Sequence, residues 1–503
     1  MIVKSDADQI EDYLHDASYL KGGCAERVLF PENPDEVAKA LAEATRKNTP
    51  VTISGAGTGT VAGRVPLGGI VMATDRLNHI KSISRADAGG FAIAEAGVRL
   101  IDLQRAVESV GLLYPPDPTE RSCFIGGNIA TNASGARTFK YGATRKYVER
   151  LKVVLATGDI LDLRRGAIHA DQRGRLRIQL MGRVIEAQLP TYQMPAVRKH
   201  ASGYFIEPAM DLIDLFIGSE GTVGVVVEAE LKLLPKPEGL LGGIVFFEAE
   251  SDLLGFVREV RERSLQNRVN GGNPTVREGA RMDARALEYF DRESLRFLRQ
   301  KYESVPESAL GAIFFEQETL SATEDELMNE WLSLLENHHA LTDQSWFAGN
   351  EPDQAKLREF RHALPVLMNE WFAQHNQRKV STDMAVPDQE FAGMLRFYQD
   401  ALRGGDLRYT IFGHIGDNHV HVNILPRNDD EAAKAWAIYR QFIHRAIEVG
   451  GTISAEHGIG KLKREYLREL YGDEHLREMA KLKSTFDPAG ILGRGTMFSE
   501  EFL

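Results

Sequence analysis

The stretch Val51-Thr52-Ile53-Ser54-Gly55-Ala56-Gly57-Thr58-Gly59 predicts a short strand that runs directly into a glycine-dense loop. Two further glycine clusters follow, at residues 125–135 and 218–224. Glycine lets backbone N–H groups converge on an anion, because no side chain blocks the approach and positive φ angles are allowed. Each cluster alone is better explained by tight structural turns. Together, in one predicted domain, they favour a site for a large phosphate-bearing cofactor.

The two common nucleotide fingerprints are absent from the first loop. In a G-x-G-x-x-G pattern that starts at Gly55, the last glycine would fall on Thr60, and residues 61–66 predict irregular chain rather than a helix. No Gly-Lys-Ser/Thr follows either, which excludes a P-loop. The cofactor site is therefore neither a Rossmann site nor a P-loop.

Strand and helix signals alternate through the first half of the chain. Asn33-Pro34-Asp35-Glu36 predicts a helix start, with Asn as the N-cap and Glu three residues later. We expect strands at 70–74 and 91–98 and a hairpin over 151–163. The run Leu234-Pro235-Lys236-Pro237-Glu238-Gly239 marks the best domain boundary, because it combines two prolines, a glycine and charged residues.

The second half predicts an antiparallel sheet covered by helices. Strands are expected at 243–247, 312–316, 409–412 and 419–425, separated by long charged segments such as 288–302, which we expect to be helical. The fold class is therefore α+β.

Composition narrows the class of protein. The chain has 503 residues, of which 43% are hydrophobic and 26% charged, as in ordinary globular proteins. Its formal charge of −12 argues against nucleic acid as a partner. Cys24 and Cys123 are the only cysteines, too few for a Cys₄ iron–sulfur cluster. Residues 1–9 lack the apolar core of a signal peptide, and no apolar stretch is long enough to span a bilayer, so we expect a cytoplasmic protein.

Histidines gather in one segment of the second half, Phe412-Gly413-His414-Ile415-Gly416-Asp417-Asn418-His419-Val420-His421-Val422-Asn423. A turn at Gly416-Asp417 would join two strands, and the period of a strand puts His419, His421 and Asn423 on one face. Glu456-His457 follows in a glycine frame. A single strand histidine is usually structural, but two histidines with one carboxylate form a recognised set for a catalytic divalent metal.

The ordered motifs carry a family resemblance. Val51 to Gly59, Tyr114-Pro115-Pro116-Asp117-Pro118-Thr119, Ile125 to Gly135 and Phe216 to Gly224 resemble the FAD domain of the vanillyl-alcohol oxidase/p-cresol methylhydroxylase superfamily. Within it, the chain resembles the FAD-linked D-2-hydroxyacid dehydrogenases, which include D-lactate dehydrogenase, D-2-hydroxyglutarate dehydrogenase and one of the subunits of glycolate oxidase. The resemblance implies an FAD-binding domain at 1–235, a cap domain at 236–449 and a C-terminal segment at 450–503 that packs back on the FAD domain.

The resemblance also implies which residues contact FAD. The first loop has no histidine, so we expect the FAD to be non-covalent. The implied contacts are Ser54, Gly55, Ala56, Gly57, Thr58, Gly59, Pro118, Thr119, Gly126, Gly127, Asn128, Thr131, Asn132, Gly135, Gly221, Val223 and Val225.

For the catalytic site, the resemblance implies His414, His421 and Glu456 as ligands of a divalent metal, with Zn or Mn favoured. It implies His457 as the general base, Asn423 as a substrate contact, and Arg361 as the cation that binds the substrate carboxylate. This chain has His419 where relatives carry asparagine, so His419 is either a further ligand or a change in the turn. Ser381 stands where the 2-hydroxyglutarate enzymes carry a lysine, which favours a D-lactate-like substrate, although Lys379 stays open as the second cation.

The expected reaction is FAD-dependent oxidation of a D-2-hydroxy acid to the 2-oxo acid. Because the chain holds no iron–sulfur motif, electrons would leave to an external acceptor: a cytochrome, an iron–sulfur subunit, an electron-transfer flavoprotein or a quinone. A homodimer stays open. The alternatives are a non-redox flavin transferase of the alkylglycerone-phosphate synthase type, a flavin-free metal-binding protein and a non-catalytic flavoprotein that shuttles electrons.

Overall fold

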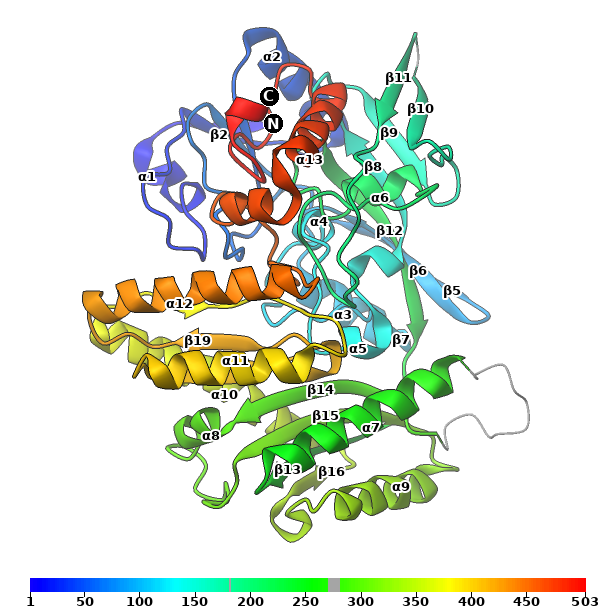
Figure 1. The fold of residues 1–503 in the computed structure, drawn as a ribbon. Coiled ribbons are helices and arrows are strands. Elements are labelled where there is room, and N and C mark those ends of the chain that lie inside the picture. Colours follow the sequence, from blue (N-terminus) through cyan, green and yellow to red (C-terminus); the bar gives the residue numbers. More distant parts are fainter. Residues whose placement is uncertain (181, 270–280) are drawn as a thin grey trace.

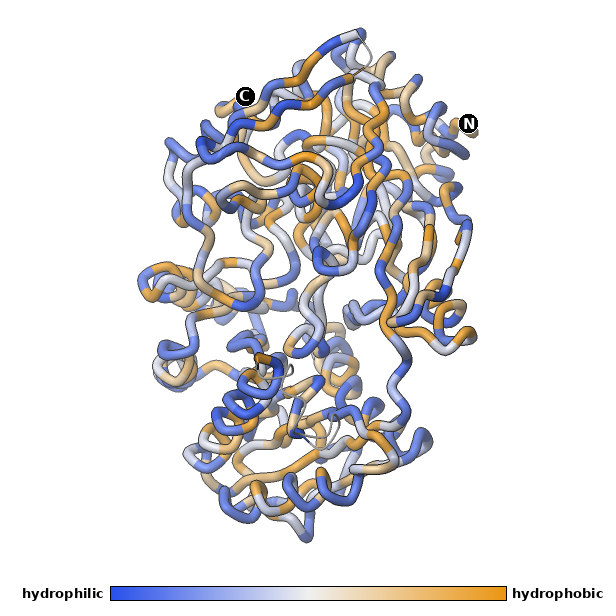
Figure 2. The backbone as a smooth tube through the Cα atoms, turned by 90° about the vertical axis from the view of Figure 1, so that its right-hand side faces the viewer, coloured by the Kyte–Doolittle hydropathy of each residue, from blue (hydrophilic) through white to orange (hydrophobic). Residues whose placement is uncertain are grey.

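The computed structural model describes residues 1–180, 182–269 and 281–503. It has two lobes, which Figures 1 and 2 show one above the other from two sides. The N-terminal lobe contains the residues before Pro235 and also the C-terminal segment. The cap lobe is built on a single sheet that starts at Gly239.

The first sheet of the N-terminal lobe has the order β1-β2-β4-β3, with β2, β4 and β3 parallel. Its strands are β1 (Ile2–Lys4), β2 (Arg27–Phe30), β3 (Val51–Ser54) and β4 (Ile70–Ala73). Helix α2 (Pro34–Lys47) packs on it and starts as predicted, since the Asn33 side chain accepts a 3.0 Å hydrogen bond from the backbone N–H of Glu36.

The second sheet of this lobe has the order β5-β6-β12-β8-β9, with β7 paired to β12. Its strands are β5 (Ile80–Ala86), β6 (Gly89–Glu95), β7 (Leu112–Leu113), β8 (Val148–Val154), β9 (Ile160–Arg164) and β12 (Val225–Pro235). The expected hairpin is β8–β9, in which Val154 pairs with Ile160. A separate ribbon joins β10 (Arg175–Leu180) to β11 (Arg183–Gln188).

Helices and the C-terminal segment complete the N-terminal lobe. The C-terminal segment runs against β3, where the Val51 N–H donates to the Ile491 carbonyl (2.8 Å) and the Gly493 N–H donates to the Val51 carbonyl (3.0 Å). The helices are α1 (Ala7–Ile10), α3 (Leu100–Glu108), α4 (Ile125–Ala130), α5 (Thr138–Tyr141), α6 (Leu212–Phe216) and α13 (Arg464–Phe486).

The cap lobe is a seven-stranded antiparallel sheet of order β16-β13-β15-β14-β18-β19-β17. Its strands are β13 (Gly239–Phe247), β14 (Ala284–Asp291), β15 (Gly311–Thr319), β16 (Trp346–Ala348), β17 (Val380–Ser381), β18 (Tyr409–Gly413) and β19 (His421–Ile424). Its helices are α7 (Glu250–Val269), α8 (Arg292–Leu298), α9 (Glu324–Asn337), α10 (Glu351–His375), α11 (Phe391–Gly404) and α12 (Asp429–Glu448).

The predicted helix over 288–302 is wrong in its first part. Residues up to Asp291 belong to β14, which is buried along its whole length, and helix α8 begins only at Arg292. Asp291 marks the change, because its side chain accepts the backbone N–H of Ser294 (2.8 Å) as an N-cap. The charged pattern was misleading because Glu288 is buried and ion-paired instead of facing solvent.

The two lobes meet where α5 packs on β14. Arg137, beside α5, forms an ion pair with Glu316 of β15 (3.1 Å), and Lys140 does so with Glu318 (2.7 Å). No helix in the described part of the chain is long and apolar enough to cross a membrane. The fold is therefore α+β, as expected. The histidine segment joins β18 to β19 in the cap sheet, and strand β14 of the same sheet contacts the N-terminal lobe.

Candidate active site and flavin pocket

A tight turn between β18 and β19 brings the histidine segment together. His414 follows β18, a 3₁₀ turn covers Ile415–Asp417, and Asn418 takes a left-handed conformation with φ of +53°. The N–H of His419 then returns to the carbonyl of His414 (3.2 Å). Gly416 is needed here because an added Cβ would lie 2.9 Å from the ring of Phe139, in the N-terminal lobe.

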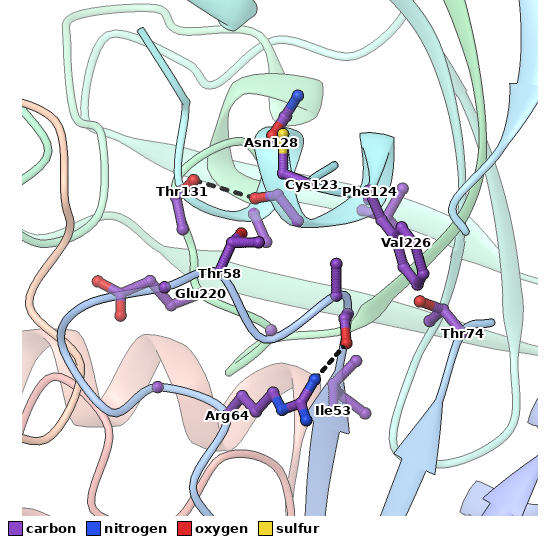
Figure 3. Close-up of a pocket in the computed structure, with 18 of the residues that line it drawn as sticks. Ile53, Thr58, Arg64, Thr74, Cys123, Phe124, Asn128, Thr131, Glu220 and Val226 are labelled. Carbon is purple, nitrogen blue, oxygen red and sulfur yellow. Dashed lines mark hydrogen bonds between the residues drawn. The ribbon is translucent and has the colours of Figure 1, made fainter. Parts of the chain in front are cut away.

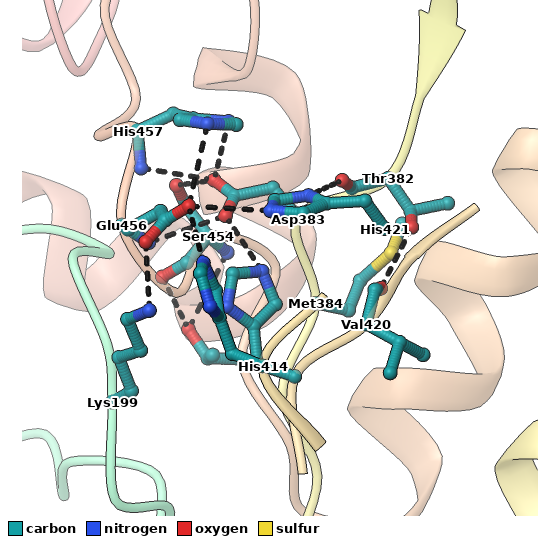
Figure 4. Close-up of polar contacts among 12 residues, drawn as sticks. Lys199, Thr382, Asp383, Met384, His414, Val420, His421, Ser454, Glu456 and His457 are labelled. Atoms are coloured by element: carbon teal, nitrogen blue, oxygen red, sulfur yellow. Dashed lines mark hydrogen bonds and ion pairs between the residues drawn. The ribbon is translucent and has the colours of Figure 1, made fainter. Parts of the chain in front are cut away.

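Four side chains of this region could hold a metal ion: His414, His419, His421 and Glu456 offer ligand atoms that all lie within 4.8 Å of one another. Figure 4 shows this region in close-up, with His414, His421 and Glu456 labelled. Nε2 of His414 lies 3.4 Å from Oε1 of Glu456, and Nε2 of His421 lies 3.2 Å from the same atom. Two ligands at zinc bond lengths in a tetrahedron are about 3.4 Å apart. The three side chains predicted as ligands are therefore spaced as a metal requires.

The outer nitrogens of these histidines support the same assignment. Nδ1 of His414 donates to Glu288 (2.6 Å), and Nδ1 of His421 donates to the carbonyl of Thr382 (2.9 Å). Metal-bound histidines usually donate their second N–H to a carboxylate or a backbone carbonyl in this way. Both Nε2 lone pairs then face the carboxylate of Glu456, an arrangement that a cation stabilises. The residues fit a divalent metal.

Electrostatics keep the acids of the site ionised. Burial alone would raise the pKa of Glu288, but the charge of Arg361 and the hydrogen bonds from Arg361 and His414 outweigh it and hold this pKa at about 2. Burial likewise opposes ionisation of Glu456, whose pKa is nevertheless held well below its usual value, mainly by Lys199 and His414. Lys199 is buried, and its Nζ lies 2.7 Å from Oε2 of Glu456.

His457 stands beside this cluster and is oriented by Asp383. Nδ1 of His457 lies 3.3 Å from Oδ2 of Asp383, which also accepts the backbone N–H of His457 (3.1 Å). Ser454 Oγ (2.6 Å) and Lys463 Nζ (2.7 Å) donate to the same oxygen. Burial lowers the pKa of His457 to about 4, although Asp383 and Glu456 act in the opposite direction. A neutral imidazole of this kind can accept a proton.

The glycine clusters surround a pocket in the N-terminal lobe, which Figure 3 shows in close-up. It contains about 1050 Å³ of atom-free space, part of it open to solvent. Eleven of the residues predicted to contact FAD line it: Gly55, Ala56, Gly57, Thr58, Gly59, Gly126, Gly127, Asn128, Thr131, Gly221 and Val225. His457 also lines this pocket, so it borders both the pocket and the metal cluster.

The walls of this pocket fit a dinucleotide. An added Cβ at Gly59 or Gly127 would meet no protein atom within 4 Å, so the backbone is bare on that side. Gly57 has a φ of +78°, and the guanidinium of Arg64 fixes the loop by donating to the carbonyl of Gly55 (2.8 Å). Nδ2 of Asn128 is buried and has no hydrogen-bond partner among the described residues. Glycine backbone that no side chain covers, next to the unpaired N–H donor of Asn128, forms a site that suits a polar, phosphate-bearing ligand.

Six residues predicted to contact FAD do not line the pocket: Ser54, Pro118, Thr119, Asn132, Gly135 and Val223. Val223 is in the core, and Thr119 is exposed. Asn132 accepts the N–H of Arg145 (2.9 Å), and a Cβ at Gly135 would meet the Asp117 carbonyl at 2.0 Å. Asn132 and Gly135 therefore contact neighbouring segments of the chain.

Arg361 and Asn423 lie in the same region of the cap lobe as the histidines. Nε and Nη2 of Arg361 both lie 2.9 Å from Oε2 of Glu288, so this arginine is linked to His414 through a shared carboxylate. Asn423 is fully buried on β19, and its Oδ1 has no hydrogen-bond partner in the described ranges. The structure thus brings the predicted side chains together, with the guanidinium fork engaged by Glu288.

Several contributors were not predicted. Lys199 and Glu288 are single charged residues in segments without a motif, and no signal in one sequence distinguishes them. Asp383 lies two residues after Ser381, which the sequence analysis singled out, and that position could have indicated it. Glu220 sits in the third glycine cluster at a φ of +53° and accepts the N–H groups of Ile459 (2.7 Å) and Gly460 (2.8 Å). It therefore holds the segment after His457 against the pocket.

Comparison with known proteins identifies the family. One family model, the FAD binding domain, matches residues 25–164, and another, the C-terminal domain of FAD linked oxidases, matches residues 273–497. Over 97% of its length, the chain is 32% identical to the glycolate oxidase subunit GlcD of Bacillus subtilis (strain 168), covering 92% of that protein. The chain belongs to the FAD-linked D-2-hydroxyacid dehydrogenase family. The predictions of family and enzyme class, an FAD-dependent 2-hydroxyacid dehydrogenase, are confirmed at this level.

The chain also matches other members of the family over nearly their whole length. The D-lactate dehydrogenase of Anaerostipes hadrus is 32% identical (96% of this chain, 92% of that protein), and the D-2-hydroxyglutarate dehydrogenase of Stutzerimonas stutzeri (strain A1501) is 27% identical (99% and 96%). A solved alkyldihydroxyacetonephosphate synthase superposes with a TM-score of 0.67 at 15% identity, covering 98% of this chain and 82% of the other. At that identity it confirms the fold alone, as predicted.

Proposed function

We propose that this family member oxidises a D-2-hydroxy acid of the D-lactate type to the 2-oxo acid, with non-covalent FAD, a divalent metal and an external electron acceptor. The single observation that carries the proposal is the position of His457, which lines the glycine pocket and lies beside the metal cluster. A base at this border can reach a substrate held between cation and flavin.

His457 acts as the general base. Asp383 engages Nδ1, which keeps the lone pair of Nε2 on the opposite side of the ring for the hydroxyl proton. Burial lowers the pKa of His457 to about 4, which keeps the imidazole neutral at ordinary pH, with its lone pair free for that proton but with reduced basicity. The cation would be held by His414, His421 and Glu456, and when bound it supplies Lewis-acid polarisation of the substrate oxygens.

The remaining residues orient the substrate. Asn423 offers a buried Oδ1 that has no hydrogen-bond partner among the described residues. Arg361 would bind the carboxylate of the substrate with its guanidinium group, which also binds Glu288. The substrate loses a proton from the hydroxyl group to His457 and a hydride from the α-carbon. FAD, when bound in the glycine pocket, supplies the acceptor for that hydride. A cytochrome, iron–sulfur subunit, electron-transfer flavoprotein or quinone would then remove the electrons.

Anaerobic flavin reduction tests the proposal. Purified protein is mixed with D-lactate, L-lactate, glycolate or D-2-hydroxyglutarate, with and without chelator. We expect rapid bleaching with D-lactate, slower bleaching with the dicarboxylate and a loss of rate in chelator. His457→Ala should keep its flavin and lose bleaching. Flavin that no hydroxy acid reduces would contradict the proposal and support the flavin transferase or the electron shuttle instead, and protein that binds metal but no flavin would support the flavin-free metal protein.

A further inference from the structure

His419 is an unusual histidine within the proposed metal site. Its side chain is completely buried, and neither ring nitrogen has a hydrogen-bond partner among the described residues. Nε2 lies 3.2 Å from Oδ1 of Asp383, at ion-pair distance but outside hydrogen-bond geometry. A neutral imidazole carries one N–H donor and one lone pair; with the N–H of Nε2 directed at Asp383, the lone pair of Nδ1 is left without a partner inside the protein, which is costly.

The surroundings of His419 offer it one satisfactory partner. Its ring centroid lies 4.5 Å from that of His421 and 5.3 Å from that of His414. Its ligand atom belongs to the same group of four that lies within 4.8 Å. A cation between these side chains would accept the lone pair of His419, and the other ring nitrogen could then donate to Asp383, as metal-bound histidines usually do.

We propose that His419 is a fourth protein ligand, which makes the metal site of this chain a three-histidine, one-glutamate site. The inference rests on the proposed function, because it assumes that the cluster binds a metal.

A fourth protein ligand changes which metals suit the site. Four protein ligands complete a tetrahedron, the coordination of closed structural zinc sites. A hydroxy acid that binds through two oxygens would then need a cation with five or six ligands. Three imidazoles favour Zn²⁺ over Mn²⁺ in affinity, whereas the higher coordination number is one that Mn²⁺ accepts readily.

Cobalt binding tests the assignment. Chelator-treated, flavin-loaded protein is titrated with Co²⁺, and the affinity and the visible spectrum of the bound ion are compared in wild type, His419→Asn and His419→Gln. We expect both variants to keep flavin and fold, to bind Co²⁺ at least about tenfold more weakly and to show a shifted spectrum. His421→Asn serves as the positive control, and His444→Asn, on the exposed face of α12, as the matched negative control.

X-ray absorption of the Co²⁺-loaded wild type gives a readout independent of the variants, because it counts imidazoles directly. Three imidazoles per metal support the inference. Two imidazoles, with unchanged affinity in His419→Asn, overturn it and leave the proposed function standing. Wild-type protein that binds no Co²⁺, yet whose flavin is reduced by D-lactate in chelator, overturns both this inference and the metal-assisted part of the proposed function.

Discussion

Nζ of Lys199 lies 2.7 Å from Oε2 of Glu456, whereas the two histidines approach the other oxygen, Oε1. The Glu456 carboxylate is therefore divided in its contacts: one oxygen pairs with the Lys199 ammonium, and the other faces the two histidines. Ser134 Oγ also donates to Oε2 (3.2 Å), which strengthens this division. Oε1 of Glu456 is therefore the oxygen available to the proposed cation, while Oε2 stays in the buried ion pair with Lys199.

Lys199→Met should destabilise the metal-free protein more than the metal-loaded protein. Without metal, the variant leaves the buried Glu456 carboxylate without its lysine, a loss that typically costs about 3–5 kcal/mol. With metal bound, the cation compensates part of that charge. Thermal unfolding in chelator and in Mn²⁺ measures the difference, with Lys481→Met on the exposed side of α13 as the control. Equal losses in both conditions would contradict the division of the carboxylate.

Asp383→Asn should slow flavin reduction without loss of flavin. The asparagine amide can donate to Nδ1 of His457, which would place the ring proton on Nε2 and remove the lone pair that we propose as the base. We expect the limiting rate of anaerobic reduction by D-lactate to fall by about 10²–10⁴. Stopped-flow absorbance measures this rate separately from the apparent affinity for substrate, which should change far less.

The matched control for this variant is Asp388→Asn. Asp388 belongs to the same segment, but it is half exposed; its carboxylate pairs with Arg198 and accepts the Asn418 amide of the neighbouring turn, bonds that an asparagine side chain can partly replace. It should leave the reduction rate unchanged. An Asp383→Asn protein that reduces its flavin at the normal rate would show that His457 needs no carboxylate behind it.

Local signals predicted the parts of the site that depend on short stretches of chain. The turn after His414 follows from Gly416-Asp417, and the helix start at Asn33 follows from its own capping pattern. Contacts between distant segments were not predictable in this way. Glu288 pairs with a histidine 126 residues later, and its charge suggested an exposed helix because a sequence does not show its buried partners. Lys199 gave no signal for the same reason.

Gly59→Leu should yield a folded protein without flavin. Because an added Cβ at Gly59 would meet no protein atom within 4 Å, the substitution costs the fold little, but the side chain would fill the space of the proposed cofactor. Flavin absorbance per protein and circular dichroism measure the two effects. Gly393→Leu is the matched control, since Gly393 on α11 is equally open and lies outside the pocket. Normal flavin content in Gly59→Leu would place the cofactor elsewhere.

His200 should make the protein sensitive to mild acid. Its ring is stacked on Phe205, with centroids 6.4 Å apart, and the guanidinium of Arg145 lies 4.0 Å from the centroid of Phe205. Burial, with a smaller contribution from the charge of Arg145, lowers the pKa of His200 to about 4. The unfolded chain would bind this proton near pH 6.5, so between about pH 6.5 and 4 only the unfolded state takes it up. The free energy of unfolding therefore falls as the pH falls through this window.

His200→Leu removes this titration, and its stability should vary less with pH. The difference amounts to at most about 1.4 kcal/mol per pH unit within the window, the value for one proton. Urea unfolding at pH 7 and pH 5 measures it as a smaller loss of stability in the variant than in wild type. His444→Leu, whose side chain is exposed on α12, should keep the wild-type pH dependence. Parallel losses in wild type and His200→Leu would show that His200 is protonated as readily in the folded protein as in the unfolded chain, and that its position beside Arg145 does not suppress its charge.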